Sequence, residues 1–507
     1  MKHVLIKNII WTISLISCFS CKKFLDKNPG DVISSGNFWK NEDDARMGLT
    51  GVYSRLNSVS YYNYTKVFLE GYSDNAYTFL IQSFLDMTKG TVNATNVPGG
   101  FFSGPYSGIA ACNYFMANID KVEAAESLKN QFKGEVRFLR AMYYFDLVQA
   151  FGGVPLYKQE PATVEEAKIA ASSSDEVLAF VHEDLDFAIS NLPDTRYFGH
   201  AVRGAAQALK GKVLLFQKRW PEAATLLKQI IDGGVFDIAP SYSGLFLTAT
   251  QQKNPEIMFA TSYLAPNRTH SASGEGLETE VGWYGAVGVY QPMADEYECI
   301  DGKPITSSPL YNPAKPFENR DPRMDITLKL PDEDYVFSDG SVFEYPLQET
   351  PFMMQKYLDM THFPFSRDIS SVKTDVNIIH IRYADVLLMY AEAKNEASGP
   401  DASVYSAINK VRGRAEVALP PVDQVLYNSQ AALREYIRHE RRVEFCCEGL
   451  RYFDLKRWGI MDEMLKKVEN PAPYTPLNLA FGEKNNVLPF PQSEIDKNPA
   501  LQQNAGY

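Results

Sequence analysis

The chain has 507 residues, of which 45% are hydrophobic and 22% are charged. This balance is typical of a folded globular protein and excludes a disordered or fibrous chain. The formal net charge of −12 argues against nucleic acid as the ligand, because binding to phosphates needs a basic surface that releases counterions.

Residues 1–20 have the pattern of an export signal. Lys2 and Lys7 supply positive charge around the start of an apolar run that is too short to span a bilayer comfortably. The run leads to two cysteines, Cys18 and Cys21, each with small residues before it, as in a bacterial lipoprotein signal. In such a signal the cysteine carries acyl chains that hold the mature protein to a membrane. This pattern alone leaves both cysteines open, and a plain secretory signal is the alternative.

Four further cysteines are predicted to be buried free thiols: Cys112, Cys299, Cys446 and Cys447. Their spacing matches neither a zinc site nor a redox pair. A disulfide between the adjacent Cys446 and Cys447 would be strained, because two neighbouring residues cannot readily adopt disulfide geometry.

Helical periodicity recurs in pairs, which is typical of tetratricopeptide-like hairpins. One pair is predicted at 204–218 and 221–234, where small residues on the first helix let the second approach closely. A second pair is predicted at 384–397 and 402–414, and a further helix at 134–151. Their apolar stripes favour packing into a core rather than cofactor binding.

The pattern changes between residues 235 and 374. Gly, Pro, Asp and aromatic residues are frequent there, and long amphipathic runs are absent. We therefore expect irregular loops and short strands that lie over the helical scaffold, where binding surfaces tend to occur.

Three acidic residues recur every four positions, at Glu440, Glu444 and Glu448. This spacing aligns carboxylates on one helix face and is compatible with a metal site or an acid–base pair. However, arginines are interleaved at Arg438, Arg441, Arg442 and Arg451, and no Glu-x-x-His motif accompanies the set. We therefore predict an ion-pair network that fixes the C-terminal helices.

Sequence blocks along nearly the whole chain resemble one protein family. They occupy residues 21–29, 38–39, 45–53, 140–147, 151–156, 301–305, 319–323, 382–388, 391–393, 440–445, 448–458, 489–495, 498–499 and 506–507. In this order they resemble the SusD/RagB family of nutrient-binding lipoproteins.

The resemblance implies a mainly α fold. It consists of a tetratricopeptide-like helical repeat scaffold and an irregular, loop-rich region with short strands. The chain would then divide into a signal peptide at 1–20, an N-terminal region of helical hairpins at 21–234, the loop-rich region at 235–374 and a C-terminal helical region at 375–507. These parts are expected to pack as one body.

The resemblance also implies a location and a function. The family places its lipidated cysteine just before Phe-Leu-Asp, which selects Cys21 over Cys18. Lys22 and Lys23 follow here, where surface lipoproteins of such bacteria often carry acidic residues. The implied protein is anchored in the outer membrane and exposed at the cell surface. It captures oligosaccharides or polysaccharides for a SusC-like TonB-dependent transporter, with no cofactor, metal or catalysis.

The family's binding site implies candidate contacts after the first helix and in the loop-rich region. Proteins bind sugars by stacking aromatic rings on their C–H faces and by hydrogen-bonding the hydroxyls. Tyr72, Asp74 and Asn75 occupy the first position, and Gln82, two helical turns after Asp74, is expected to share its face.

Aromatic residues supply the other candidates. Phe102 stands where the family often has the tryptophan of a W-x-x-x-Y pattern, so its ring either packs or binds the ligand less strongly. Trp283 and Tyr284 lie in a glycine-rich run at 282–288, where large rings have little local core to join. We therefore expect both rings to be available at the surface.

Two other functions are compatible with the sequence. A glycoside hydrolase needs paired carboxylates, and the 62 acidic residues allow many pairs, although no HExxH, GxSxG or Walker motif is present. A scaffold that binds a peptide or another non-sugar nutrient through its helical repeats is the other alternative.

Overall fold

The computed structural model describes residues 38–59, 61–78, 82–196, 198–271, 276–331, 333–342, 349–362, 374–474 and 477–507. Cys18 and Cys21 lie outside these residues, so the predicted lipidation remains a prediction. Across the described ranges, no helix is both long enough and apolar enough to cross a bilayer.

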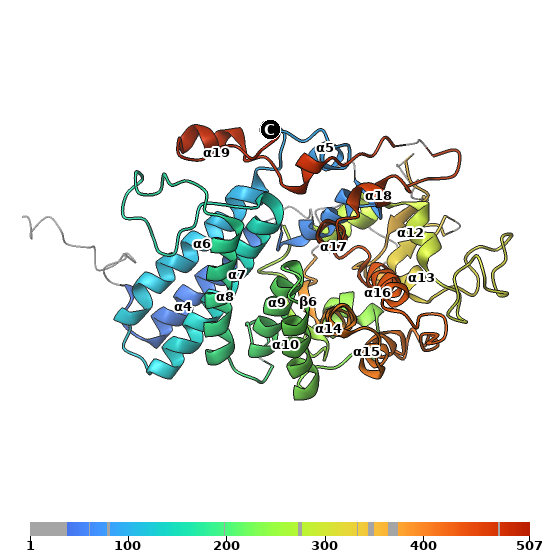
Figure 1. Cartoon of the computed structure of the whole chain (residues 1–507), viewed down its shortest axis with the longest axis horizontal. Coiled ribbons are helices and arrows are strands. Elements are labelled where there is room, and N and C mark those ends of the chain that lie inside the picture. Colours follow the sequence, from blue (N-terminus) through green and yellow to red (C-terminus); the bar gives the residue numbers. More distant parts are fainter. Residues whose placement is uncertain are drawn as a thin grey trace, which may run out of the picture.

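Four helices form the N-terminal part of the scaffold, on the left of Figure 1. They are α4 (Glu42–Tyr53), α6 (Gly100–Asn118), α7 (Glu126–Phe151) and α8 (Ser174–Asn191). The longest, α7, packs against both α6 and α8. It begins eight residues before the predicted helix at 134–151 (134 − 126 = 8), because polar residues with good helix propensity extend it beyond the apolar stripe.

The first predicted hairpin is confirmed by α9 (Arg203–Phe216) and α10 (Trp220–Gly233). A Cβ atom added at Gly211 would lie 2.6 Å from the Leu227 side chain, so the two helices approach closely at this glycine. The second helix ends at Gly233, and the next residue, Gly234, has a φ of 63°, the left-handed conformation common after a helix.

The second predicted hairpin is also confirmed, by α14 (Tyr383–Ser398) and α15 (Ala402–Arg412). Helix α14 packs against α10 as well as α15, which joins the two hairpins into one repeat scaffold. Helix α16 (Gln430–Phe445) packs on α14, and α17 (Arg451–Trp458) follows it. The mainly α, tetratricopeptide-like fold is therefore confirmed.

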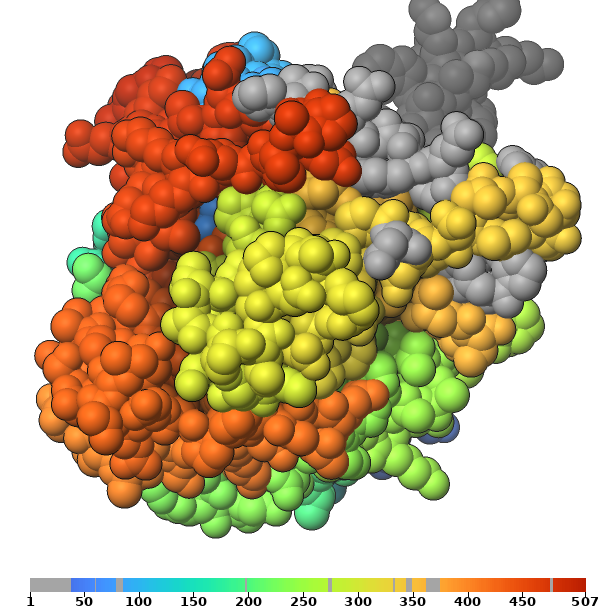
Figure 2. Space-filling view, turned by 90° about the vertical axis from the view of Figure 1, so that its right-hand side faces the viewer, coloured from blue at the N-terminus to red at the C-terminus, as the bar shows by residue number. Residues whose placement is uncertain are grey.

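Short strands form two small sheets. The first has four strands in the order β1 (Ala76–Thr78), β3 (Val287–Val289), β5 (Phe352–Met354) and β4 (Leu328–Lys329), paired antiparallel. The second pairs β2 (Ile257–Thr261) with β6 (Ile378–Arg382). Most of these strands come from the irregular region, which covers much of the face in Figure 2 in yellow-green to gold beside the orange C-terminal helices.

The remaining described helices are short and connect or cap the larger elements. They are η1 (Ser54–Ser58), η2 (Tyr64–Tyr72), α5 (Gln82–Thr88), η3 (Ile119–Lys121), η4 (Ser243–Phe246), α11 (Thr248–Gln251), η5 (Thr279–Trp283), α12 (Gln291–Glu296), α13 (Arg323–Thr327), η6 (Met360–His362), α18 (Met461–Leu465), η8 (Glu483–Asn486) and α19 (Gln492–Lys497).

One large apolar core runs through the scaffold and under the sheets. The four cysteines Cys112, Cys299, Cys446 and Cys447 are buried and free, which confirms the prediction. The sulfur atoms of Cys446 and Cys447 lie 3.6 Å apart, in contact but not bonded.

Candidate functional site

The ring pair Trp283–Tyr284 lies beside the four-stranded sheet. Trp283 is the last residue of η5, and Gly285, with φ +65°, turns the chain towards β3. Both rings are partly exposed, and their centroids lie 4.6 Å apart in an edge-to-face arrangement. Phe337 approaches Trp283 edge-on at 6.3 Å. Three rings therefore gather beside the central strands β3 and β5.

Trp283 also carries a free polar group. Its indole nitrogen is buried and has no hydrogen-bond partner in the part of the chain that the structure describes. A buried indole N–H usually finds an acceptor, so this unpaired donor marks a position where a partner is missing among the described residues. The pair combines apolar ring faces with a hydrogen-bond donor, which is the combination that a sugar ring requires.

Asp74 lies in the protein interior, contrary to the expectation of a direct contact. Its side chain is 1% exposed and forms ion pairs with Arg442 at 3.0 Å and Arg451 at 2.8 Å. Burial raises the pKa of this carboxyl, but the two arginines hold it below its ordinary value. Asp74 is therefore a charged structural link to the C-terminal helices.

Asn75 and Tyr72 are buried too. Asn75 donates to Glu70 Oε1 at 2.6 Å and accepts from Arg442 Nε at 2.7 Å, so its amide is used within the protein. Tyr72 is fully buried, and its ring packs edge-on against Phe101. The expectation of surface contacts is wrong for both residues, because the end of η2 packs against α17 and the segment after it contacts α16.

Gln82 is the first residue of α5 and its side chain lies outside the described set, so a ligand contact there remains a prediction. The spacing argument that placed it with Asp74 is wrong. Strand β1 (Ala76–Thr78) separates the two residues, so no continuous helix places them on one face.

Phe102 packs rather than projects. It is 5% exposed and contacts the rings of Tyr106, Phe151 and Phe490 at centroid distances of 4.8 to 5.5 Å. It lies at the base of a groove of about 580 Å³ between α6, residues 155–168 and α19. The packing alternative for this residue is the one that the structure favours.

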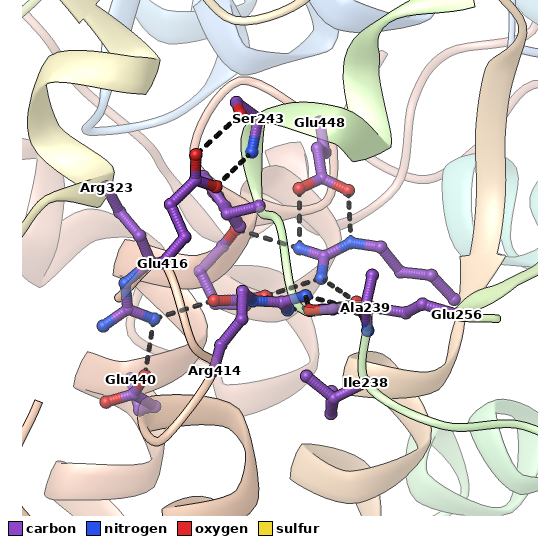
Figure 3. Close-up of polar contacts among 12 residues, drawn as sticks. Ile238, Ala239, Ser243, Glu256, Arg323, Arg414, Glu416, Glu440 and Glu448 are labelled. Carbon is purple, nitrogen blue, oxygen red and sulfur yellow. Dashed lines mark hydrogen bonds and ion pairs between the residues drawn. The ribbon is translucent and has the colours of Figure 1, made fainter. Parts of the chain in front are cut away.

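The predicted ion-pair network exists, but its partners differ from the prediction. Glu440 and Glu444 both accept from Arg323, at 2.6 and 2.7 Å, and Glu448 accepts from Arg382 at 2.7 Å and from Lys356 at 2.8 Å. Figure 3 shows part of this buried ion-pair network, with Glu256, Arg323, Arg414, Glu440 and Glu448 labelled. Its members are Glu256, Arg323, Lys356, Arg382, Arg412, Arg414, Glu440, Glu444 and Glu448.

The interleaved arginines bind other carboxylates. Arg441 pairs with Asp385 and Asp454, while Arg442 and Arg451 pair with Asp74. Successive helix residues are about 100° apart, so arginines next to the glutamates in sequence point to different neighbours. The spacing of charged residues along a helix shows which of them share a face, but it does not show which other segments of the chain pack against that face.

The network connects the sheet beside the ring pair to the scaffold. Arg323 begins α13, which leads directly into β4, and Lys356 follows β5. Both cations bind carboxylates of α16 or of the turn after it, and their side chains are at most 1% exposed. The irregular region is therefore fixed by charge as well as by apolar packing.

The network does not resemble a metal or acid–base site. Burial raises the pKa of Glu444, but Arg382, Arg414 and Arg323 hold it well below its ordinary value, so this carboxyl stays ionised and paired. Within the described ranges, no cluster of three or more His, Cys, Asp or Glu side chains could hold a metal ion.

Comparison with known proteins gives the family. The model of the SusD family matches residues 255–507, and a model described as starch-binding associating with outer membrane matches residues 23–215. The chain belongs to the SusD family. SusD-like proteins of Formosa agariphila are 26% and 27% identical to it, and each match covers 98% of this chain and 97 to 98% of the relative.

Solved SusD structures have the same fold. A SusD-like carbohydrate-binding protein of Bacteroides fragilis is 29% identical, with a TM-score of 0.81, and the match covers 92% of this chain and all of that one. Another SusD-like protein of the same species is 26% identical, with a TM-score of 0.79 over 95% of this chain. A laminarin-binding SusD-like protein is 25% identical, with a TM-score of 0.70 over 92% of this chain.

Proposed function

We propose that this protein binds oligosaccharides or polysaccharides at the cell surface and passes them, uncleaved, to a SusC-like TonB-dependent transporter in the outer membrane. The main support is membership of the SusD family, with matched segments in both halves of the chain and a 29%-identical carbohydrate-binding structure. A lipid anchor on Cys21 would hold the protein at the membrane.

Trp283 and Tyr284 are the proposed direct contacts. Their partly exposed rings can stack on the C–H face of a sugar, and the free indole N–H of Trp283 can donate to a hydroxyl. Gln82 remains a proposed polar contact. In this proposal the buried Asp74 and Asn75 act at a distance, because they fix the start of β1, which pairs with β3 next to the ring pair.

The sheet supplies the rigidity that such a site needs. Ala76 pairs with Val289 and Thr78 with Val287, so the segment after Asn75 is in register with the segment after Tyr284. Rings held on a fixed support lose little conformational freedom when a ligand binds, which favours affinity.

A binding and turnover assay tests the proposal. The purified protein would be titrated by calorimetry with a polysaccharide panel that includes laminarin, and reducing ends would be measured after long incubation. We expect saturable binding to at least one glycan with no rise in reducing ends. A steady rise would instead identify a hydrolase.

Capture of the transporter tests the partner. Affinity purification of the full-length protein from membranes of its own cells should retain a TonB-dependent barrel. If the barrel is retained while no glycan on the panel binds, the peptide or non-sugar nutrient scaffold becomes the better account.

A further inference from the structure

A groove follows strand β2 along its length. It consists of two hollows, of about 260 and 390 Å³, which share the lining residues Gly199, Ala260 and Ser262 and are therefore adjacent. Helix α4 and η1 line one part of it, and Arg196 and residues of the segment 198–202 line another. No residue of the ring pair lines either hollow, so the groove is a separate feature of the molecule.

The groove is lined by cationic side chains, whereas the protein as a whole has a negative net charge. Its lining includes Arg196, Lys253 and Arg268 and contains no Asp or Glu, although the whole chain carries a formal charge of −12. Lys253 and Arg268 are exposed, and neither forms an ion pair with a residue that the structure describes. Cations without a protein partner are available to an anion in the groove.

Other lining groups suit a ring with hydroxyl groups. The Asn57 side-chain oxygen is buried and has no hydrogen-bond partner among the described residues. Phe198 lines the neighbouring hollow and is 49% exposed, which leaves a ring face open for stacking. Gly199, with φ +78°, provides the left-handed turn that follows this ring.

A buried carboxylate fixes the walls. Glu135 on α7 is 0% exposed and accepts from the Tyr53 hydroxyl and binds His200 Nδ1, each at 2.7 Å. The Tyr53 hydroxyl also accepts from the backbone N–H of Ala201 at 2.8 Å. Glu135 thus connects α4 to the segment at 199–202 from behind the groove, so the groove exists before any ligand enters.

We propose that this groove is a second binding site, for an acidic saccharide that carries carboxylate or sulfate groups. The saccharide class rests on the proposed function, whereas the acidic character comes from the groove. Arg268 and Lys253 would bind the anionic groups through charge-assisted hydrogen bonds, and Phe198 would stack on a sugar face. The side-chain oxygen of Asn57 would accept from a hydroxyl.

The test compares charged and neutral probes on a variant that keeps the fold. The double variant Lys253→Ala/Arg268→Ala removes two exposed cations without breaking an ion pair. Its matched control is Lys466→Ala/Lys467→Ala, which changes the net charge equally at exposed cations paired with Asp462 and Glu463. The probes are an oligogalacturonate, a sulfated oligosaccharide, a neutral laminarin fragment and an acidic peptide, all followed by calorimetry.

We expect the groove variant to bind the oligogalacturonate, the sulfated probe or both roughly tenfold more weakly, while the control variant and the neutral probe show no change. Unchanged affinity for both acidic probes would overturn the inference. Equal, groove-dependent binding of an acidic peptide would overturn the saccharide assignment. Binding of the neutral probe alone would remove the groove site and leave the proposed function intact, whereas no binding by any saccharide would end both.

Discussion

At the scale of single residues, Trp283 offers the most direct test of the ring pair. Replacing it with Ala removes the largest ring and the free N–H while most of the sheet remains. We expect glycan affinity to fall by about 1 kcal/mol, a several-fold increase in Kd measured by calorimetry. Tyr114→Ala is the matched control, since this ring is 38% exposed on α6 and does not line the site. Equal effects of both changes would remove Trp283 from the binding surface.

Cys21 carries the prediction about location. Cys21→Ala should abolish metabolic palmitate labelling and move the protein from the membrane to the soluble fraction, because no acyl chain would then hold it. Cys18→Ala is the matched control and should keep both the label and the membrane fraction. If the labels behave in the opposite way, the anchor is Cys18.

Residue-level prediction succeeded where a local pattern decides the outcome. The glycine-rich run around Trp283 indicates exposed rings, and the structure places them partly exposed. Asp74 shows the limit, because Arg451 lies 377 positions away in the sequence. A carboxylate in a loop looks like a surface ligand until the fold brings two arginines to it, and one sequence does not reveal such long-range pairs.

At the scale of elements, the buried ion-pair network fixes the irregular region to α16. Arg382 of β6 takes part in it, since its side chain is 1% exposed and binds Glu256 of the irregular region together with Glu444 of α16 and Glu448. Arg382→Met would leave three buried carboxylates short of a cation. Breaking a buried pair from one side costs about 3–5 kcal/mol, and we expect a loss of this size in the free energy of unfolding, measured in urea.

The exposed pair between Arg46 and Glu42 gives the comparison. Its side chains are 48% and 47% exposed, so Arg46→Met should cost less than about 1 kcal/mol. A similarly small effect of Arg382→Met would show that the network contributes little to holding the irregular region in place.

Element prediction depended on periodicity. The predicted ends of the helices in both hairpins lie within a few residues of the observed ends. The residues that make the helix–helix contacts, apolar stripes and small residues such as Gly211, are recognisable in the sequence. The strands could not be placed, since β1, β3 and β5 have three residues each, too few for an alternating pattern to stand out.

At the scale of the whole molecule, buried charge links stability to pH in both directions. Burial opposes ionisation of Asp74, Asp454 and Glu448, but neighbouring cations lower their pKa, so these groups stabilise the protein above their unfolded pKa values near 4. That contribution is lost as the pH falls through the lower, folded values. Burial raises the pKa of Asp146 to about 6. This carboxyl therefore destabilises the folded protein as the pH rises above about 4, which is the opposite effect.

His439 provides a test of how stability changes above neutral pH. It lies on α16, with Nδ1 2.8 Å from Glu296 at the end of α12 and Nε2 3.5 Å from Glu298, which follows α12. Burial lowers its pKa, but the two carboxylates raise it to about 10. The folded state therefore keeps a proton that the unfolded state releases near pH 6.5, and this stabilisation is complete below pH 6.5 and lost as the pH rises towards 10.

The comparison of two histidine variants isolates this effect. The Tm of the wild type should exceed that of His439→Gln most below pH 6.5, and the difference should shrink steadily from pH 6.5 up to pH 10. Lys66 and Lys456, whose pKa values burial lowers to about 8 and 7, titrate in the same window, but they do so in both proteins and cancel in the difference. His182→Gln is the control: burial lowers the pKa of His182, so its difference should stay constant above pH 7. A His439→Gln difference that is independent of pH would mean that the imidazole is neutral between its two carboxylates.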